Sequence, residues 1–323
     1  MDSLYLPSDS TNQHQRLPGT AVVAELARRV SNWGRWGPDD QLGTLNFITP
    51  AKVAHACTLV SAGRVIALGV PLDKDGPQRT APRRYNPIHF MDELPMDYVL
   101  PGGVGVADDV LVLPLQATTQ WDSLAHVSHN GKLYGGRSAQ LVTSHGALTN
   151  SVRSFSDRVI GRGILADVAT YHGVDTLPPG HEITAQELDD VLRAERVAVE
   201  EGDILLVRTG FLNFCRSNNW DGYHGDAPGL GVNTTVWLHE KSVAAVAADT
   251  ASLEVKPFSV HEVAVPFHIV ALVYMGMLLG EIFDLEQLAA DCRTDGRYEF
   301  LFIAPPLPVT AGVGSPVNPY AVK

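Results

Sequence analysis

The sequence is poor in cysteine, and its cysteines follow no regular spacing. Cys57, Cys215 and Cys292 are the only three in 323 residues, and they lie far apart. Their odd number and wide separation argue against a disulfide framework and against a zinc-ribbon motif. An intracellular protein is the default for such a chain, and we predict a cytoplasmic location.

Long apolar runs and an excess of positive charge are also missing. No apolar run approaches the roughly 18 residues of a transmembrane helix. The polar N-terminus lacks the basic region and apolar core of a secretory signal. Lys and Arg total 24 against 36 Asp and Glu, a formal net charge of -12, which argues against nucleic acid or an anionic membrane as a partner. A small-molecule substrate is the expected partner.

The composition is that of a globular protein with a large core, because 45% of the residues are hydrophobic and 19% are charged. We find no internal repeat, low-complexity tract or clear linker. Residues 1–20 are predicted to form a polar N-terminal arm, which is either disordered or laid on a neighbouring subunit. Residues 21–323 are predicted to form a single domain.

Apolar periodicity and capping signals predict alternating helices and strands. Thr49-Pro50 and the Thr184–Glu187 capping box mark two helix starts. Helices are expected over 21–30, 50–61, 146–152, 184–195, 232–241 and 284–290, and strands over 65–70, 110–115, 161–168, 204–208, 244–247 and 300–303. This alternation predicts an α/β or α+β layered domain. The tail from Pro305 is rich in Pro and Gly.

Residues 71–105 show no periodicity and are rich in Pro, Gly, Asp and Arg. We interpret them as one long loop. Because a loop of this length inside a compact domain is usually functional or a subunit contact, it suits exchange of contacts between subunits.

The stretch most suggestive of chemistry is Gln116–Tyr134, which holds the pair Asp122 and His126. It follows the apolar segment 110–115, which is expected to be a strand that delivers these side chains at its end. A carboxylate and an imidazole four residues apart can meet at one site if the chain turns between them. A second candidate pair is His268 with Glu281, because a histidine inside an apolar run needs a polar partner when buried.

Several common active-site motifs are not in the sequence. It has no His-Glu-x-x-His zinc motif and no Gly-x-Ser-x-Gly elbow. The Gly-rich segment 99–109 does not follow a strand and open a helix, so no nucleotide cofactor is expected. The remaining histidines have no partner at a spacing that would form a recognisable motif.

The chain resembles the cyclase-like metal-dependent hydrolases, a family that includes bacterial-type kynurenine formamidase and isatin hydrolase. The resemblance covers most of the chain. It rests on NWGRWGPDDQLGTLNFITP, QWDSLAHVSHNGKLYGG, GRGILADV, GDILLVRTG, PGL, HIVALVYMGMLLGEIFDLEQLA and GVGSPVNPYA. It implies a swivelling β/β/α fold, with a mixed, barrel-like β core flanked by helices, and assembly into homodimers or homotetramers.

The family signature is His-x-Gly-Thr-His-x-Asp-x-Pro-x-His. On this sequence Asp122 matches its metal-binding aspartate and His126 matches its final, acid–base histidine. Gln116 and Gln120 stand in place of the two leading histidines. Thr119 keeps the threonine, whereas Thr118 and Leu124 replace the glycine and the proline.

His268 and Glu281 match the distal metal-binding histidine and glutamate of the family. Glutamine is a poor substitute for imidazole toward Zn²⁺, although its carbonyl can coordinate a hard cation such as Mn²⁺. Three arrangements stay open. One metal is held by Asp122, His268 and Glu281, with or without Gln120; a weak Mn²⁺ or Mg²⁺ site uses the glutamines; or no metal binds and the residues act by acid–base chemistry.

By this resemblance the protein is expected to be a hydrolase that opens an amide, lactam, lactone or N-formyl bond of a small cyclic or aromatic substrate. His126 would protonate the leaving group. Gln116 and Gln120 are candidates to contact the substrate or a developing oxyanion. Trp121, with Trp33, Trp36 or Tyr134, forms either an aromatic wall or core packing. The alternatives are a metal-independent cyclase, dehydratase or isomerase, and a small-molecule binder without turnover.

Overall fold

The computed structural model describes residues 18–81 and 83–323. Apart from its last three residues, the expected polar arm over residues 1–20 therefore lies outside the described residues. No helix in the described ranges combines the length and the apolar character needed to span a membrane.

Among the described residues, nine strands form one curved, mixed sheet in the order β1-β17-β15-β9-β11-β13-β14-β6-β16. Its parallel centre runs through β9, β11, β13 and β14, and the other neighbours pair antiparallel. Of these, β11 and β13 are buried along their whole length, which explains why their sequences are almost entirely apolar. The strands are β1 (Val65–Ala67), β6 (Gln120–Asp122), β9 (Ile160–Asp167), β11 (Ile204–Arg208), β13 (Ala245–Ala248), β14 (Leu278–Glu281), β15 (Glu299–Ile303), β16 (Gly314–Pro316) and β17 (Tyr320–Val322).

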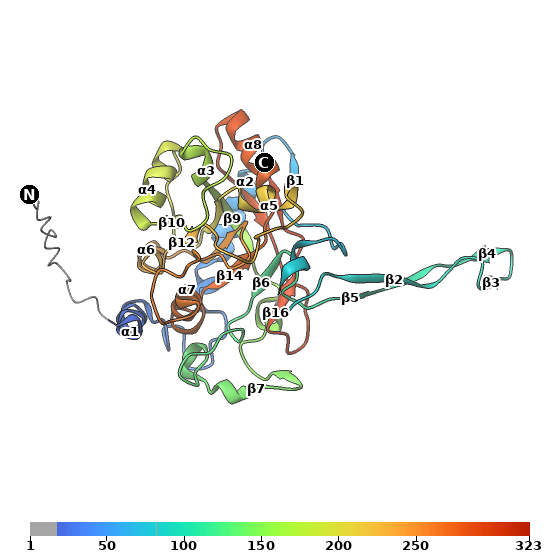
Figure 1. The fold of residues 1–323 in the computed structure, drawn as a ribbon, viewed down its shortest axis with the longest axis horizontal. Helices are drawn as coiled ribbons and strands as arrows, with labels where there is room; N and C mark the ends of the chain where they lie inside the picture. Colours follow the sequence, from blue (N-terminus) through green and yellow to red (C-terminus); the bar gives the residue numbers. More distant parts are fainter. Residues whose placement is uncertain (1–17, 82) are drawn as a thin grey trace, which may run out of the picture.

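Helices flank this sheet, which gives the mixed α/β class expected from the sequence (Figure 1). Thr49 caps α2, and Thr184 with Glu187 forms the expected capping box of α4. The helices are α1 (Gly19–Val30), α2 (Pro50–Thr58), α3 (Val168–Tyr171), α4 (Ala185–Ala194), α5 (Phe211–Ser217), α6 (Thr234–Glu240), α7 (Pro266–His268) and α8 (Glu286–Asp295), with the π-helix η6 (Ile269–Met275). Short 3₁₀ turns are η1 (Gly43–Phe47), η2 (Pro77–Thr80), η3 (Tyr134–Gly136), η4 (Ala139–Leu141) and η5 (Val152–Phe155).

One local prediction was wrong, and two short strands were not predicted. The expected helix over 146–152 is instead β8 (Gly146–Ala147), paired with β7 (Val142–Thr143) and followed by a turn. Gly146 has a φ of 106°, which no right-handed helix contains. The Pro/Gly-rich tail, for which the sequence predicted no element, supplies β16 and β17. Three-residue strands leave no periodicity to detect, so only their pairing with β6, β1 and β15 reveals them.

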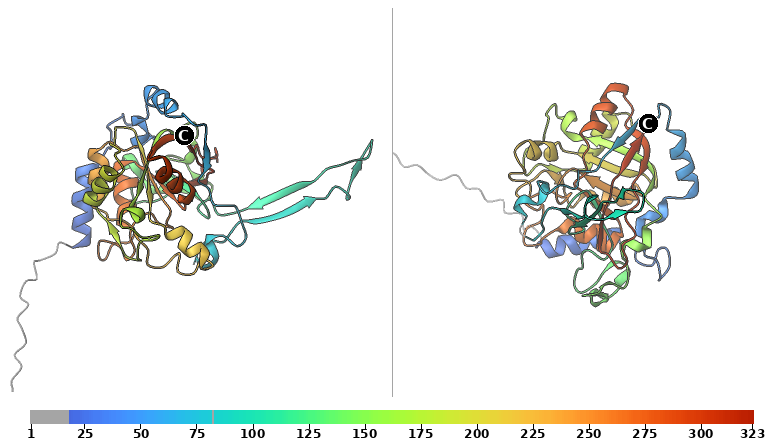
Figure 2. Two further views of the ribbon diagram at one scale, coloured as in Figure 1. Left: turned by 90° about the horizontal axis from the view of Figure 1, so that it is seen from above. Right: turned by 90° about the vertical axis from the view of Figure 1, so that its right-hand side faces the viewer.

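The expected loop over 71–105 was wrong from Ile88 onward, and the expected strand over 110–115 was confirmed only in part, because the strand found there ends at Val112. The chain instead forms an extended β-arm, which we define as residues 88–112 (Figures 1 and 2). In it β2 (Ile88–Glu93) pairs antiparallel with β5 (Asp108–Val112), and β3 (Val99–Leu100) pairs with β4 (Val104–Gly105). The arm projects away from the sheet, so its apolar side chains are exposed and no buried face produces a regular pattern.

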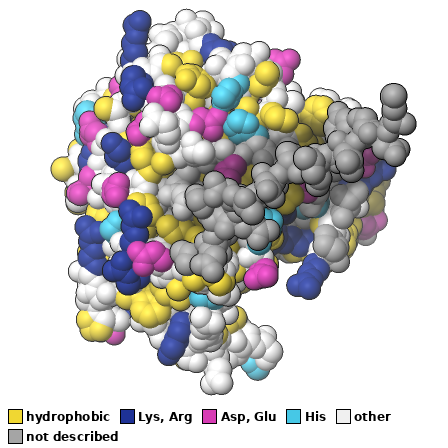
Figure 3. All heavy atoms as spheres, turned by 60° about the vertical axis from the view of Figure 1, so that its left-hand side comes forward, with side chains coloured by type: hydrophobic (Ala, Val, Ile, Leu, Met, Phe, Trp, Pro, Cys, Tyr) yellow, Lys and Arg dark blue, Asp and Glu magenta, His cyan; other side chains and the backbone are white. Residues whose placement is uncertain are grey.

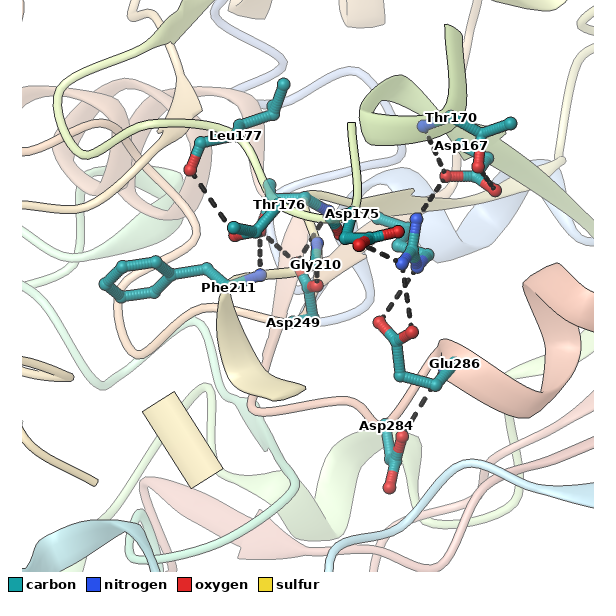
Figure 4. A network of polar contacts seen from close by, with 12 residues as sticks. Asp167, Thr170, Asp175, Thr176, Leu177, Gly210, Phe211, Asp249, Asp284 and Glu286 are labelled. Carbon is teal, nitrogen blue, oxygen red and sulfur yellow. Dashed lines mark hydrogen bonds and ion pairs between the residues drawn. The ribbon is translucent and has the colours of Figure 1, made fainter. Parts of the chain in front are cut away.

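Where the parallel strands end, a buried polar network ties them together (Figure 4). Arg208 at the end of β11 pairs with Asp167 of β9 at 2.7 Å and with Glu286 of α8 at 2.9 Å. Asp249, just after β13, accepts hydrogen bonds from the backbone amides of Thr209 and Gly210. Burial raises the pKa of Asp249 to about 6 despite these bonds. The network therefore holds the carboxyl ends of β9, β11 and β13 together, on the side of the sheet where β14 also ends.

The outer surface is mixed in character. On the face that Figure 3 shows, acidic and basic side chains are interspersed among hydrophobic ones over the described part of the chain. The small parallel pair β10 (Glu182–Ile183) and β12 (Gly229–Leu230) lies outside the main sheet.

Candidate active site

The site begins on β6, whose three residues are all buried. β6 lies between β14 and β16, with Gln120 opposite Glu281 and Trp121 opposite Gly280. Because side chains alternate along a strand, Gln120 and Asp122 share one face and Trp121 takes the other. The strand that precedes these residues in the sequence, β5, ends in the β-arm at Val112. The polar side chains therefore lie on β6 itself and not at the end of β5.

Asp122 meets His268 and Glu281 in a buried cluster. Each of the three offers a ligand atom within 4.8 Å of the others. His268 ends α7, and Glu281 ends β14 beside β6. Three segments separated by up to 159 residues therefore converge, as the sequence resemblance led us to expect.

His268 is held between two carboxylates. Its Nδ1 lies 2.5 Å from Glu254 Oε1, and its Nε2 lies 3.2 Å from Glu281 Oε1. Burial alone would lower the pKa of His268, but the hydrogen bonds to Glu254 and Glu281 outweigh it and raise the pKa to about 10. A cation at Nε2 would have to displace this proton, so binding there would depend on pH.

Glu254 was missed by the sequence reasoning. It is 1% exposed, and its Oε2 accepts the backbone N–H of Phe267 at 3.0 Å. It therefore fixes both the start of α7 and the orientation of the imidazole. Glu254 lies 14 residues before His268 in a segment without periodicity or motif, so no sequence signal pointed to it.

Asp122 is buried, and its Oδ2 has no hydrogen-bond partner among the described residues. Burial raises its pKa, and the negative charge of Glu281 adds to that, while His126, His268 and Arg84 act in the opposite direction. An ionised carboxylate with a bare oxygen is costly in such a place. Asp122 is therefore set to bind a cation or to hold a proton.

His126 faces Asp122 from the side that reaches solvent. Its Nε2 lies 3.8 Å from Asp122 Oδ1, and about a quarter (23%) of its side chain is exposed. That separation is too long for a direct hydrogen bond but short enough for a bridging water. The predicted Asp122–His126 pair is thus brought together, with the histidine as its accessible member.

Gln120 interacts with the carboxylates through its amide nitrogen. Its Nε2 lies 2.8 Å from Glu281 Oε2 and 3.4 Å from Asp122 Oδ1. Its Oε1 has no partner among the described residues, and neither has Nε2 of Gln116. In this orientation Gln120 holds the two acids together. A rotation of its amide would turn Oε1 toward the cluster as a further oxygen ligand.

A pocket of about 330 Å³ opens onto this cluster. His268 and Glu281 lie at its buried end, and His126 lies on its wall. The other lining side chains come from two segments, 78–84 and 251–265, together with Val127 and His224. Burial lowers the pKa of His224, although a hydrogen bond from its ring to the carbonyl of Pro77 partly opposes this.

Two proposed wall residues lie in the core instead. Trp121 is fully buried, packs edge-on against Phe283 and Phe302, and donates its indole N–H to the carbonyl of Ala304 at 2.9 Å. Tyr134 is 1% exposed and donates its hydroxyl to Asp40. These positions favour the core-packing alternative over an aromatic substrate wall.

The two other tryptophans proposed for the wall, Trp33 and Trp36, pack against neighbouring aromatic rings, although Trp33 is 37% exposed. Trp33 stacks on Tyr274 with ring centroids 5.3 Å apart, and Trp36 packs edge-on against Phe47. Neither is among the residues that line the pocket next to His268.

The cluster suits a divalent cation. Asp122, Glu281 and Glu254 place three carboxylates beside one imidazole, so two negative charges would stay uncompensated if all were ionised. One imidazole nitrogen and two carboxylates form a donor set that Zn²⁺ or Mn²⁺ accepts, and three protein ligands leave a position open for water. The unpartnered oxygen of Asp122 points to the same conclusion.

A second group that could hold a metal lies on α4 and the segments before it. His172 and His181 both bond Oε1 of Glu187, at 2.5 and 2.8 Å. Glu187 already has a structural role there, because its other oxygen caps α4. The sequence reasoning had set these histidines aside.

The fold and site together define a mixed α/β protein with a buried acidic cluster beside a pocket. Residues 48–255 match the family described as "Putative cyclase". A crystal structure described as that of a novel cyclase superposes with a TM-score of 0.82 at 36% identity, covering 91% of this chain and 100% of that chain. The chain therefore belongs to the cyclase family, which confirms the resemblance seen in its sequence.

More distant structures share the fold. Isatin hydrolase A from Labrenzia aggregata matches with a TM-score of 0.60 at 16% identity, over 80% of this chain and 94% of its own. A protein from Bacillus stearothermophilus described as a predicted metal-dependent hydrolase matches with a TM-score of 0.51 at 16% identity, over 81% and 98%. No curated protein matches the chain in a sequence comparison.

Proposed function

We propose that the protein is a hydrolase that opens an amide, lactam, lactone or N-formyl bond of a small cyclic or aromatic substrate. The observation that carries this proposal is the buried cluster of Asp122, His268 and Glu281, with the bare Oδ2 of Asp122, at the end of an accessible pocket. Membership of the cyclase family and the fold shared with isatin hydrolases support it.

In this proposal Asp122, His268 and Glu281 hold one divalent cation, Mn²⁺ or Zn²⁺. A bound cation of this kind would lower the pKa of a water molecule and polarise the substrate carbonyl. Glu254 keeps the His268 ring in place through Nδ1 and leaves Nε2 directed at the cluster. Gln120 restrains the two carboxylates from the adjacent position on β6.

His126 is the proposed acid–base residue. It lines the pocket, is accessible, and lies 3.8 Å from Asp122. From there it can take a proton from the attacking water and give it to the leaving nitrogen or oxygen. The negative charge of Asp122 would stabilise the imidazolium formed between these two steps.

One observation favours a second candidate function. Gln120 directs its amide N–H groups, not its carbonyl, at Asp122 and Glu281, which suits two acids that share a proton. That arrangement supports a metal-independent cyclase, dehydratase or isomerase in which Asp122, Glu281 and His126 exchange protons with a carbonyl compound. A protein that binds a small molecule without turnover is a further alternative.

Metal analysis combined with a substrate panel separates these possibilities. We expect about one divalent ion per chain after purification without chelator, and hydrolysis of at least one lactone, lactam or N-formyl aryl amine that EDTA abolishes. Asp122→Asn should remove the ion and lower kcat/KM by about 10³-fold. His126→Ala should lower kcat by about 10²-fold or more and keep the ion.

His145→Ala serves as the matched control, because His145 is exposed and does not line the pocket. Activity without a bound ion and unaffected by EDTA would support the metal-independent alternative. Ligand-induced stabilisation without any product would support the binder.

We also propose that the protein assembles into homodimers or homotetramers through the β-arm. Its exposed apolar side chains include Phe90, Met96 and Tyr98, which are 48%, 85% and 66% exposed. An apolar strip of this kind on a projecting arm is typical of an interaction surface. The location is still predicted to be cytoplasmic.

A further inference from the structure

The pocket beside the candidate active site is rich in positive charge. Among the described residues, the side chains of Arg83, Arg84 and Lys256 line it together with His268 and Glu281. They come from two separate segments, the chain after η2 and the chain just after Glu254. The protein as a whole has 24 basic against 36 acidic residues, so three cations at one pocket run against its composition.

These cations are not used up in ion pairs. Within residues 18–81 and 83–323 the structure contains 24 ion-pair contacts, and none involves Arg83, Arg84 or Lys256. One guanidinium N–H of Arg84 donates to the backbone carbonyl of Gln116 at 2.9 Å. Lys256 is held by its backbone, which exchanges two hydrogen bonds with Ala227. The charged groups of Arg83 and Lys256 therefore have no acidic partner among the described residues and are available to an anion.

Of the three cationic side chains, Arg84 can be explained by charge compensation inside the protein. Arg84 is close enough to Asp122 to favour its ionised form, so part of its charge serves the buried carboxylates. Arg83 is exposed and Lys256 is half-buried, whereas His268 and Glu281 are 5% and 3% exposed. The pocket therefore runs from a cationic outer part to an acidic inner end.

We propose that the substrate carries a carboxylate of its own, bound by Arg83 and Lys256, while its reacting carbonyl lies at the inner end near His126. This rests on the proposed function, because it assigns the substrate class of the same site. A singly charged carboxylate is matched by Arg83 and Lys256 alone, since Arg84 already favours the ionised form of Asp122. A guanidinium and an ammonium bind a carboxylate by charge-assisted hydrogen bonds.

The test compares benzoate with benzamide, two probes of nearly equal shape, by calorimetric titration of the full chain with and without EDTA. We expect benzoate to bind about 10-fold more tightly than benzamide in both conditions, because the preference comes from the side chains and not from a metal. The double variant Arg83→Gln, Lys256→Gln should lose this preference. The double variant Lys132→Gln, Lys241→Gln removes the same charge at exposed positions away from the pocket and should keep it.

Equal binding of the two probes to the wild-type chain would overturn the proposal, and so would a benzoate preference that survives in the Arg83, Lys256 variant. Tighter binding of phenylphosphonate than of benzoate would overturn the assignment to a carboxylate. The proposed function can fail separately. If no metal or hydrolysis is found but the benzoate preference depends on Arg83 and Lys256, the substrate class stands and the hydrolase does not.

Discussion

Strand β6 and the β-arm depart from the usual distribution of side chains in opposite ways. In β6 the polar residues Gln120 and Asp122 are fully buried. In the β-arm the apolar residues Phe90, Met91 and Tyr98 are about half exposed or more. Unpaired buried polar groups and large exposed apolar patches both cost free energy. Where a protein has them, they usually serve a function. We therefore interpret β6 as part of the reactive site and the arm as a contact surface.

The two regions also differ in how they are held. β6 is hydrogen-bonded on both sides, to β14 and β16, so its backbone is held in place. The arm is a two-stranded ribbon with no third strand within the described residues, and such ribbons are marginal in water unless something packs on them. Rigidity suits catalysis and an open apolar ribbon suits assembly.

The largest effect of the variants that compare these two regions is expected at Glu254, which orients the imidazole of His268. Glu254→Gln keeps the shape of the side chain but removes the charge that faces His268 Nδ1. We expect metal affinity to fall by about 10- to 100-fold, because glutamine has one acceptor oxygen for the two hydrogen bonds that Glu254 accepts, from His268 and from Phe267. We also expect the pKa of His268 to fall below its present value of about 10. Metal competition titration and NMR of the imidazole measure the two effects.

Glu201→Gln is the matched control for that variant, since Glu201 is exposed and the change in charge is the same. If Glu254→Gln kept both wild-type metal affinity and the wild-type imidazole pKa, Glu254 would not be a positioning residue.

The arm should respond in the opposite manner, with a change in assembly and little change in folding. Phe90→Ser with Tyr98→Ser removes two exposed apolar side chains. We expect a monomer by light scattering, while the free energy of unfolding of that monomer changes by less than about 1 kcal/mol, because neither side chain is in the core.

Leu148→Ser with Tyr171→Ser is the control for the arm, since these side chains are 70% and 46% exposed but lie elsewhere on the surface. An arm variant that assembled like the wild type would show that the subunits meet through another surface.

The smallest effect concerns a buried carboxylate outside both regions. Burial raises the pKa of Glu195 from its usual value near 4.5 to about 8, although the backbone amide of Asp167 donates to it. Between these values the native state binds more protons than the unfolded state, so stability falls as pH rises, by at most about 1.4 kcal/mol per pH unit from this group. Glu195→Gln should flatten this slope and raise stability at pH 9 by about 1–2 kcal/mol.

Urea unfolding of Glu195→Gln across pH 5–9, beside the exposed variant Glu201→Gln, measures this slope. Parallel curves for the wild type and Glu195→Gln would contradict the raised pKa. The same slope of stability against pH would be expected from Asp122 in β6 if no nearby cation compensated the charge of its buried carboxylate.

Local signals in the sequence correctly predicted the elements whose stability is local. Thr49 and Thr184 fixed two helix starts through hydrogen bonds to residues three positions away. The runs 161–168 and 204–208 predicted β9 and β11, because strands buried on both faces are mostly apolar. The resemblance to the cyclase family located Asp122, His126, His268 and Glu281, which the structure places around one pocket and its buried end.

Tertiary structure decided what depends on partners far along the chain. Glu254 meets His268 only because the chain folds back at α7, and β16 and β17 are strands only because β6, β1 and β15 accept their hydrogen bonds. Trp121 points into the core because that face of β6 is packed against other residues. The β-arm projects from the sheet, and nothing among the described residues covers its apolar side chains. The sequence alone therefore determined the family and the acidic character of the site. The fold decided which side chains complete that site, because hydrogen bonds and burial between distant segments leave no local pattern.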